Sequence, residues 1–96
     1  MAAYLVVDTL LEDPEGYEQY KILAKPIVEK YGGQYMVRGG AITLRESDLW
    51  TPTRMVLIEF PDVQAANRFY DSPEYQTALS MGRDASKRTL FIVEGL

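Results

Sequence analysis

The sequence contains neither cysteine nor histidine, and both absences narrow the chemistry that the chain can perform. Without cysteine there is no disulfide, no thiolate metal site and no thiol nucleophile. Without histidine the chain lacks the commonest general base and the usual ligand of haem iron and transition metals. Any chemistry must therefore use carboxylates, Tyr, Lys, Arg or Ser, or a cofactor brought in, and we expect no resident cofactor.

Several kinds of segment are also missing. There is no block of five or more basic residues and the net charge is −4, which disfavours nucleic acid or an anionic membrane as a partner. The N-terminal segment has no basic region and only a short apolar run, so we expect neither a signal peptide nor a membrane anchor. We therefore expect a cytoplasmic protein. No D-x-D or EF-hand spacing occurs, and we predict no metal site.

The composition is that of a folded chain. Hydrophobic residues make up 47% of the 96 residues and aromatic residues 11%. A chain of this length forms one domain, residues 1–96, which buries roughly 60–65% of its unfolded surface.

The segment from residue 50 to residue 75 carries the clearest structural signals. Met55–Phe60 is apolar except for one residue and lies between Pro52 and Pro61, which predicts a short strand. Asp62 then supplies a helix N-cap, and Ser72-Pro73-Glu74 repeats that start signal with a cap, a proline and an acidic residue. A strand, a helix and a second helical piece are therefore predicted in close succession.

The remaining elements complete a regular order. We predict a strand over residues 4–11 and then a helix from Asp13-Pro14-Glu15 to Gly32-Gly33, with a kink at Pro26. A second strand is predicted over residues 34–38, and it resumes at 41–44 after two glycines. A loop over residues 45–53 and a last strand over 89–93 complete the prediction. The order is β-α-β-β-α-β. It predicts an α+β, ferredoxin-like antiparallel sheet with its helices on one face.

Both faces of the predicted sheet are apolar. Apolar residues occupy alternate positions on both faces of three predicted strands. In the strand over 55–60, one face has Val56, Ile58 and Phe60 and the other has Met55 and Leu57. In the strand over 89–93 the faces have Leu90 and Ile92 against Phe91 and Val93, and in the strand over 4–11 they have Leu5 and Val7 against Tyr4 and Val6. Two helices can cover one face only, and a monomer rarely exposes an apolar patch larger than a few hundred Å². We therefore predict a homodimer that forms through the uncovered sheet face.

Glu59 is the candidate catalytic residue. It shares a strand face with Met55 and Leu57, and a partly buried carboxyl there could have a raised pKa and act as an acid or base. The alternative is structural: Glu59 would pair with Arg38 or Arg54, or lie at the rim of the sheet.

The candidate ligand-binding residues each have a structural alternative as well. Arg38 precedes two glycines and could orient an anionic group, with the glycine N–H groups nearby, or it could form an ion pair at a bend. Ser72 could help hold an anion at a helix start, or it could be an N-cap only. Trp50, Tyr70 and Tyr75 could form the walls of a small-molecule pocket, or they could be core or dimer contacts.

Nearly the whole chain resembles a known family. The matching residues are Asp13-Pro14 with Tyr17 and Tyr20, Tyr31-Gly32-Gly33, Arg38-Gly39-Gly40, Trp50-Thr51-Pro52, Val56–Pro61, Ala65-Ala66, Tyr70-Asp71-Ser72-Pro73-Glu74-Tyr75 and Val93-Glu94-Gly95. They resemble the family named domain of unknown function 1330, in the dimeric α+β barrel superfamily. Phe69 departs from it, since the family often has Trp there, and the loop over 45–50 is individual.

The resemblance implies a ferredoxin-like protomer and a dimer whose two sheets pack into a barrel, without a settled activity. Related dimeric barrels include monooxygenases that use haem or no cofactor, and lactone isomerases. The haem type needs an axial ligand, usually His, which this chain lacks. Two functions follow as hypotheses. One is binding or conversion of a small anionic or aromatic metabolite in a cleft, and the other is a dimeric interaction module without catalysis.

Overall fold

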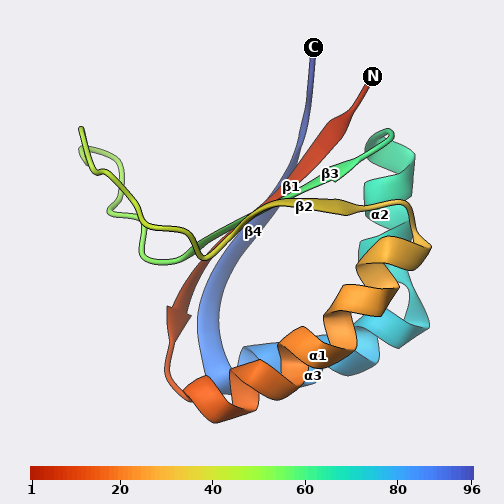
Figure 1. The fold of residues 1–96 in the computed structure, drawn as a ribbon, viewed down its shortest axis with the longest axis horizontal. Coiled ribbons are helices and arrows are strands. Elements are labelled where there is room, and N and C mark those ends of the chain that lie inside the picture. Colours follow the sequence, from red (N-terminus) through yellow and green to blue (C-terminus); the bar gives the residue numbers. More distant parts are fainter.

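The computed structural model describes all residues 1–96 and has the predicted order of elements (Figure 1). These are β1 (Ala3–Leu11), α1 (Pro14–Lys30), β2 (Gln34–Arg38), β3 (Met55–Phe60), α2 (Val63–Asp71), α3 (Pro73–Ala85) and β4 (Ser86–Glu94). The four strands form one antiparallel sheet in the order β2-β3-β1-β4. This is the ferredoxin-like arrangement, and the prediction of the fold class is confirmed.

The three predicted helix starts are confirmed by their caps. The Asp13 side chain accepts a hydrogen bond from the backbone N–H of Gly16 at 3.2 Å, and Asp62 from that of Ala65 at 2.7 Å. Ser72 separates α2 from α3 and caps the latter. Each cap satisfies an N–H group that the first turn of a helix leaves unpaired.

The core lies between the helices and one face of the sheet. The strands contribute Leu5, Val7, Val56, Ile58 and Phe60, and the helices contribute Tyr17, Tyr20, Ala24, Val28, Phe69 and Tyr75. Phe69 is central, because its ring lies 5.4 Å from that of Phe60 and 4.3 Å from that of Tyr75. Packing of α1, α2 and α3 on this face fixes which residues of the sheet point inward (Figure 1).

The other sheet face, here called the outer face, carries Tyr4, Val6, Met55, Leu57, Phe91 and Val93, as the alternation predicted. No helix covers it. Phe91 is 43% exposed and Val93 is 47% exposed, so apolar surface faces outward in the single chain. None of the three helices is both long and apolar enough to cross a membrane.

Two boundaries differ from the prediction. Residues 41–44 form no strand, and the whole connection from residue 39 to residue 54 is irregular and extends away from the helices (Figure 1). β4 begins at Ser86 instead of Thr89, because β1 is long enough to pair Leu11 with Ser86 and Thr9 with Arg88. The helix α1 continues through Pro26, and its axis bends along its length (Figure 1).

Candidate functional site

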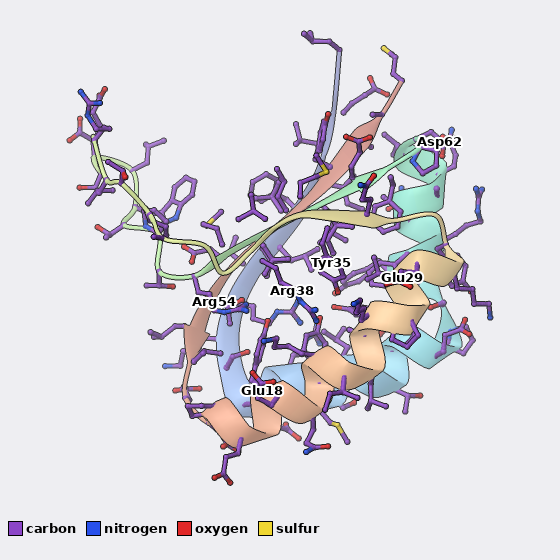
Figure 2. The ribbon with its side chains drawn as sticks, in the orientation of Figure 1. Glu18, Glu29, Tyr35, Arg38, Arg54 and Asp62 are labelled. Atoms are coloured by element: carbon purple, nitrogen blue, oxygen red, sulfur yellow. The ribbon has the colours of Figure 1, made fainter.

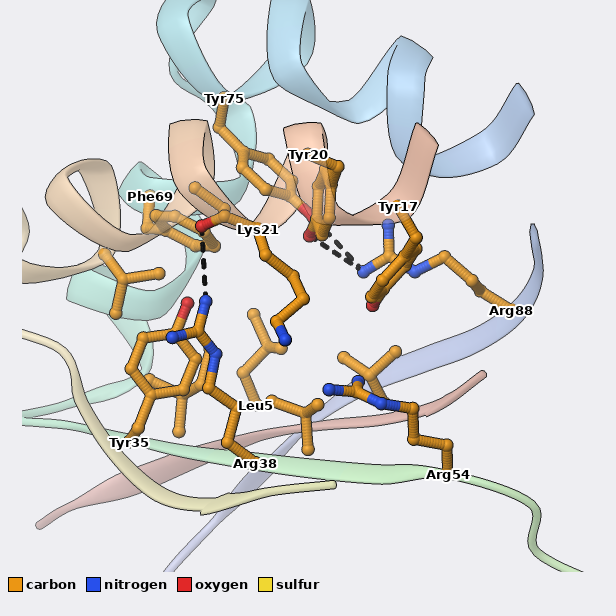
Figure 3. A pocket seen from close by; sticks show the side chains of 15 residues that line it. Leu5, Tyr17, Tyr20, Lys21, Tyr35, Arg38, Arg54, Phe69, Tyr75 and Arg88 are labelled. Carbon is orange, nitrogen blue, oxygen red and sulfur yellow. Dashed lines mark hydrogen bonds between the residues drawn. The ribbon is translucent and has the colours of Figure 1, made fainter. Parts of the chain in front are cut away.

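A small pocket lies between the sheet and α1, and basic and tyrosine side chains dominate its polar lining (Figure 3). The cations are Lys21, Arg38, Arg54 and Arg88, and the tyrosines are Tyr17, Tyr20, Tyr35 and Tyr75. The remaining lining residues are apolar, and no carboxylate is among them. We call this cavity the arginine pocket. Its volume is about 20 Å³, which is room for about one water molecule.

Arg88 extends from β4 under the helices. Its Nη2 donates hydrogen bonds to the hydroxyl oxygens of Tyr20 at 3.2 Å and of Tyr75 at 3.3 Å, and these two hydroxyls are 2.8 Å apart. Burial raises the pKa of Tyr20 far above its usual value, so its hydroxyl stays protonated. Burial alone would lower the pKa of Arg88, but interaction with Tyr20 and Tyr75 outweighs it, and the guanidinium stays charged.

Arg54, the residue before β3, reaches the pocket past Gly39. Its guanidinium lies 5.3 Å from the centre of the Tyr17 ring. Gly39 has a φ of +76°, and a Cβ atom there would lie 2.9 Å from Arg54 Nη2. The glycine therefore provides both the turn and the space for the guanidinium. Its N–H donates to the carbonyl of Met55 at 2.8 Å, so this N–H is already used within the sheet.

Arg38 and Lys21 lie where α1 faces the edge strand β2 (Figure 3). Arg38 Nη2 donates to the carbonyl oxygen of Lys21 at 3.2 Å, and the guanidinium stacks 4.4 Å from the centre of the Tyr35 ring. Lys21 bonds to Glu18 at 3.0 Å, and the Glu18 side chain is mostly exposed. Burial raises the pKa of Tyr35, which keeps its hydroxyl protonated as well.

The buried atoms without a hydrogen-bond partner belong to three residues that are neighbours across the sheet. They are Thr9 Oγ1, Arg54 Nη1, Arg88 Nε and Arg88 Nη1, and the chain has no other buried side-chain nitrogen or oxygen of this kind. Thr9 lies on β1 between the two arginines: its N–H bonds to the carbonyl of Arg54, and Arg88 is its partner in β4. With strands about 4.8 Å apart, the Cα atoms of Arg54 and Arg88 are separated by roughly 10 Å.

None of these arginines forms an ion pair. The two ion pairs of the chain are Lys21–Glu18 and Lys30–Glu74. Although the net charge of the protein is −4, the arginine pocket is locally positive. Buried N–H groups of a cation that donate to no protein acceptor can bind an anion that enters from solvent.

The structure brings some of the predicted site residues together. Arg38 and Tyr75 both line the arginine pocket. Tyr70 lies behind Tyr75, with ring centres 5.6 Å apart, and faces a separate cleft with Arg83. Ser72 is 4% exposed, accepts from the backbone N–H of Tyr75 and donates to a carbonyl, so its hydroxyl is fully used in capping α3.

Glu59 and Trp50 lie outside the arginine pocket, so the structure does not bring Glu59 and Arg38 together in this cavity. Glu59 pairs with Tyr4 and Gln34 on the outer face, whereas Arg38 points to the helix side (Figure 2). Glu59 forms no ion pair with either arginine considered in the alternative hypothesis. Trp50 is 52% exposed on the connection between β2 and β3, and borders a cleft with Met55 and Phe91 on the outer face.

Asp8 anchors this connection from the outer face. Its Oδ1 accepts from the backbone N–H and hydroxyl of Thr53, at 2.9 and 2.8 Å, and from the N–H of Arg54 at 3.1 Å. Its Oδ2 accepts from Trp50 Nε1 at 2.9 Å. These bonds fix the backbone of Arg54, whose side chain then enters the arginine pocket on the other side of the sheet.

Sequence reasoning missed Lys21, Arg54 and Arg88 as pocket residues. Arg88 was detectable, because it alternates with Leu90 and Ile92 on the inward side of β4 once the strand is extended to Ser86. Lys21 sits beside Tyr20 on α1, and no pattern in the sequence points to its role.

Comparison with known proteins adds the family and the fold. The family description that matches is "Domain of unknown function (DUF1330)", over residues 2–96. No curated protein matches. A protein of unknown function from Rhodopseudomonas palustris is 20% identical, with a TM-score of 0.74 over 99% of this chain and 82% of that one.

Two further solved structures are similar. SnoaB from Streptomyces nogalater, described as a cofactor-independent oxygenase, is 16% identical, with a TM-score of 0.70 over 99% of this chain and 93% of that one. A dimeric ferredoxin-like protein of unknown function from Jannaschia sp. CCS1 is 15% identical, with a TM-score of 0.69 over 99% of this chain and all of that one. At these identities the likeness concerns the fold. The family match covers residues 2–96, and the chain therefore belongs to the DUF1330 family.

Proposed function

We propose that the protein binds a small organic anion with an apolar or aromatic body in the arginine pocket. The observation that carries the proposal is that Arg54 and Arg88, which line the pocket, have buried side-chain nitrogen atoms without a hydrogen-bond partner. A buried cation without a counter-ion lowers the stability of a fold, and an anionic ligand would compensate it. A protein that needed only to complete its core would be more stable with apolar residues at these positions.

The apolar part of the ligand is inferred from the rest of the lining. Leu5, Val7 and Phe69 lie beside the tyrosine rings, so a flat ring would find stacking partners and an apolar floor. Ligand pockets usually enclose about 300–1,000 Å³, far more than this cavity in its present form. Lys21 runs from α1 into the pocket and is 26% exposed, so rotation of its side chain toward solvent would open the site (Figure 3).

The proposal concerns binding, and conversion of the ligand is a further possibility to be tested. No carboxylate lines the pocket and the chain has no histidine, so a general base of either kind is missing there. Glu59 lies on the outer face and gains no support as a proton carrier for this pocket. SnoaB, described as a cofactor-independent oxygenase, shows that a protein of similar fold is compatible with chemistry that needs no cofactor.

We also propose that two copies associate through their outer faces. Phe91 and Val93 are exposed in the single chain, and similar solved structures from Jannaschia sp. and Thermobifida fusca are described as dimeric. This surface is the observation that favours the second hypothesis, a dimeric module without catalysis. Such a module would need the outer face and would have no use for the arginine pocket.

Thermal unfolding against a panel of anions separates the two hypotheses. The panel contains benzoate, hydroxybenzoates and short aliphatic carboxylates, with benzyl alcohol as a neutral control. A ligand at 100 times its Kd adds about 2.7 kcal/mol to the free energy of unfolding. Arg54→Gln tests the pocket, and Arg45→Gln is the matched control, because it removes the same charge from an exposed loop residue.

We expect at least one aromatic anion to raise the Tm of the wild type and of Arg45→Gln, and to have a much smaller effect on Arg54→Gln. The proposal is wrong if no anion stabilises the wild type, or if both variants respond equally.

A further inference from the structure

From the donors in the arginine pocket we infer its substrate class: a weakly acidic phenol or enol, which the pocket binds in ionised form and whose hydroxyl pKa it lowers. This inference rests on the proposed function and adds the protonation state of the ligand. It differs from simple capture of a carboxylate, which is already ionised at neutral pH. The consequence is that binding would release a proton to solvent.

The polar groups that face the pocket are almost all hydrogen-bond donors. Most elements around the pocket contribute one or more of them, whereas β1 and α2 contribute apolar residues only. These polar groups are Tyr17, Tyr20 and Lys21 from α1, Tyr35 and Arg38 from β2, Arg54 before β3, Tyr75 from α3 and Arg88 from β4. Guanidinium and ammonium groups have no acceptor at all. The carboxylates beside these groups do not line the pocket: Glu18 bonds to Lys21 and is mostly exposed, and Glu29 interacts with Tyr35 electrostatically.

Three of the acceptors around the pocket are already occupied. The hydroxyls of Tyr20 and Tyr75 bond to each other and both accept from Arg88. The carbonyl oxygen of Lys21 accepts from Arg38. The proton of a neutral phenol would find only the hydroxyl oxygens of Tyr17 and Tyr35 as free acceptors in the pocket lining. An ionised oxygen would instead face four cationic side chains and no carboxylate. The ionised form, with an acceptor oxygen only, fits the site better.

The unpartnered donors indicate where the oxygen would lie. Arg54 and Arg88 flank Thr9 on neighbouring strands, and each has a buried N–H without a partner. An ionised oxygen bound in the pocket would accept hydrogen bonds from these two guanidinium groups, which the protein leaves partly without acceptors. Charge on that oxygen would be stabilised more strongly there than in water, because both cations act at short range in a region of low dielectric.

The proton balance of the step is simple. The ligand O–H bond breaks heterolytically, the electron pair stays on oxygen, and the proton passes to water or buffer. Burial raises the pKa of Tyr20 and of Tyr35, so both stay protonated and neither competes as a resident anion. Nothing is oxidised or reduced. A tenfold preference for the ionised ligand corresponds to a decrease of one unit in its pKa.

A chromogenic phenol provides the test. We would titrate the protein into 4-nitrophenol at a pH about one unit below the pKa of the free phenol, and follow the phenolate absorbance band. We expect the band to grow with protein concentration, about one proton to be released per phenol bound, and the apparent Kd to rise about tenfold for each further unit of decrease in pH. Its methyl ether, 4-nitroanisole, has the same ring without the proton and should bind weakly at every pH.

Two further probes separate failure of this inference from failure of the proposed function. 4-Nitrobenzoate is ionised throughout the same pH range. If it stabilises the protein but 4-nitrophenol binds without a phenolate band, or with a Kd independent of pH, the inference is wrong and the anion site stands. If neither compound binds, both proposals fail. Arg54→Gln should reduce the phenolate signal, and Arg45→Gln should retain it. The comparison with 4-nitroanisole needs only the wild type, so the test does not depend on the folding of a variant.

Discussion

Replacement of Asp8 should weaken anion binding in the arginine pocket, although Asp8 lies on the opposite face of the sheet. Its carboxylate accepts four hydrogen bonds, from Trp50, twice from Thr53, and from the backbone N–H of Arg54. Asp8→Ala removes all four. Asp8→Asn retains the Oδ1 acceptor for the bonds of Thr53 and Arg54, but turns an amide N–H₂ group toward the Trp50 N–H.

The bonds give the size of the effect. A hydrogen bond contributes a net stabilisation of about 0.5–1.5 kcal/mol, and the low end applies here because the groups are partly exposed and water can replace the lost partners. Asp8→Ala should therefore lower the free energy of unfolding by about 2 kcal/mol, and Asp8→Asn by about 0.5–1 kcal/mol. With its backbone released, Arg54 should lose about 1.4 kcal/mol of its interaction with a bound anion, which is about tenfold in Kd.

The same network has a pH signature. Burial alone would raise the pKa of Asp8, but the hydrogen bonds from Thr53, Arg54 and Trp50 outweigh it and hold the pKa below its ordinary value of 3.8. A group whose pKa is lower in the folded state stabilises the fold at neutral pH. That contribution is complete above the ordinary value and is lost as the pH falls through the lower folded pKa. Asparagine does not titrate, so in Asp8→Asn the free energy of unfolding should lack this decrease at acid pH.

Urea unfolding at fixed protein concentration measures the stability of each variant, and the same preparations provide the Kd for the best anion of the panel. Glu59→Gln is the matched control, since Glu59 lies on the same face and forms no ion pair. It should change neither quantity appreciably. If Asp8→Ala lowers the stability but leaves the Kd unchanged, Asp8 does not position Arg54 for binding and the reasoning fails.

Two further changes test the site and the surface separately. Gly39→Ala should lower the stability by about 1–3 kcal/mol and weaken anion binding, because alanine is strained at a φ of +76° and its Cβ would displace the Arg54 guanidinium. Unfolding and ligand titration measure both, and unchanged affinity would contradict the role of this glycine. Phe91→Lys should convert the proposed dimer into a monomer in light scattering, because it places a charge on the outer face. A dimer that persists in this variant would mean that the copies associate elsewhere.

The fold was predictable because its signals are local. The capping residues Asp13, Asp62 and Ser72 act on the N–H groups of the next turn, and each begins a helix as predicted. Strand alternation in Met55–Phe60 also assigned both sheet faces correctly. These signals require no knowledge of which strands are neighbours, so one sequence contains enough information to place them.

The site was less predictable, because it depends on register between strands. Tyr35 pairs with Ile58 and Arg38 with Val56, but a bulge at Met36 intervenes between Tyr35 and Val37. If β2 were regular and kept Met36 in the alternation, Arg38 would point to the outer face. Glu59 lies on that face, so plain alternation would have placed the two side chains on the same face of the sheet. One inserted residue reverses the face of every residue that follows, and nothing in this sequence marks its position.

Three irregular features of the chain position Arg38 and Arg54 in the arginine pocket. The bulge in β2 turns Arg38 inward, the glycine at position 39 leaves room for Arg54, and Asp8 holds the backbone of Arg54 from the far side. A sheet that served only to pair with a second copy would need none of these devices, and a regular β2 would bury fewer charges. Such departures from regular structure are expected at a binding site. There, grouping cations lowers the stability of the fold but allows a ligand to bind. These three features therefore support the proposal that the arginine pocket binds an anion.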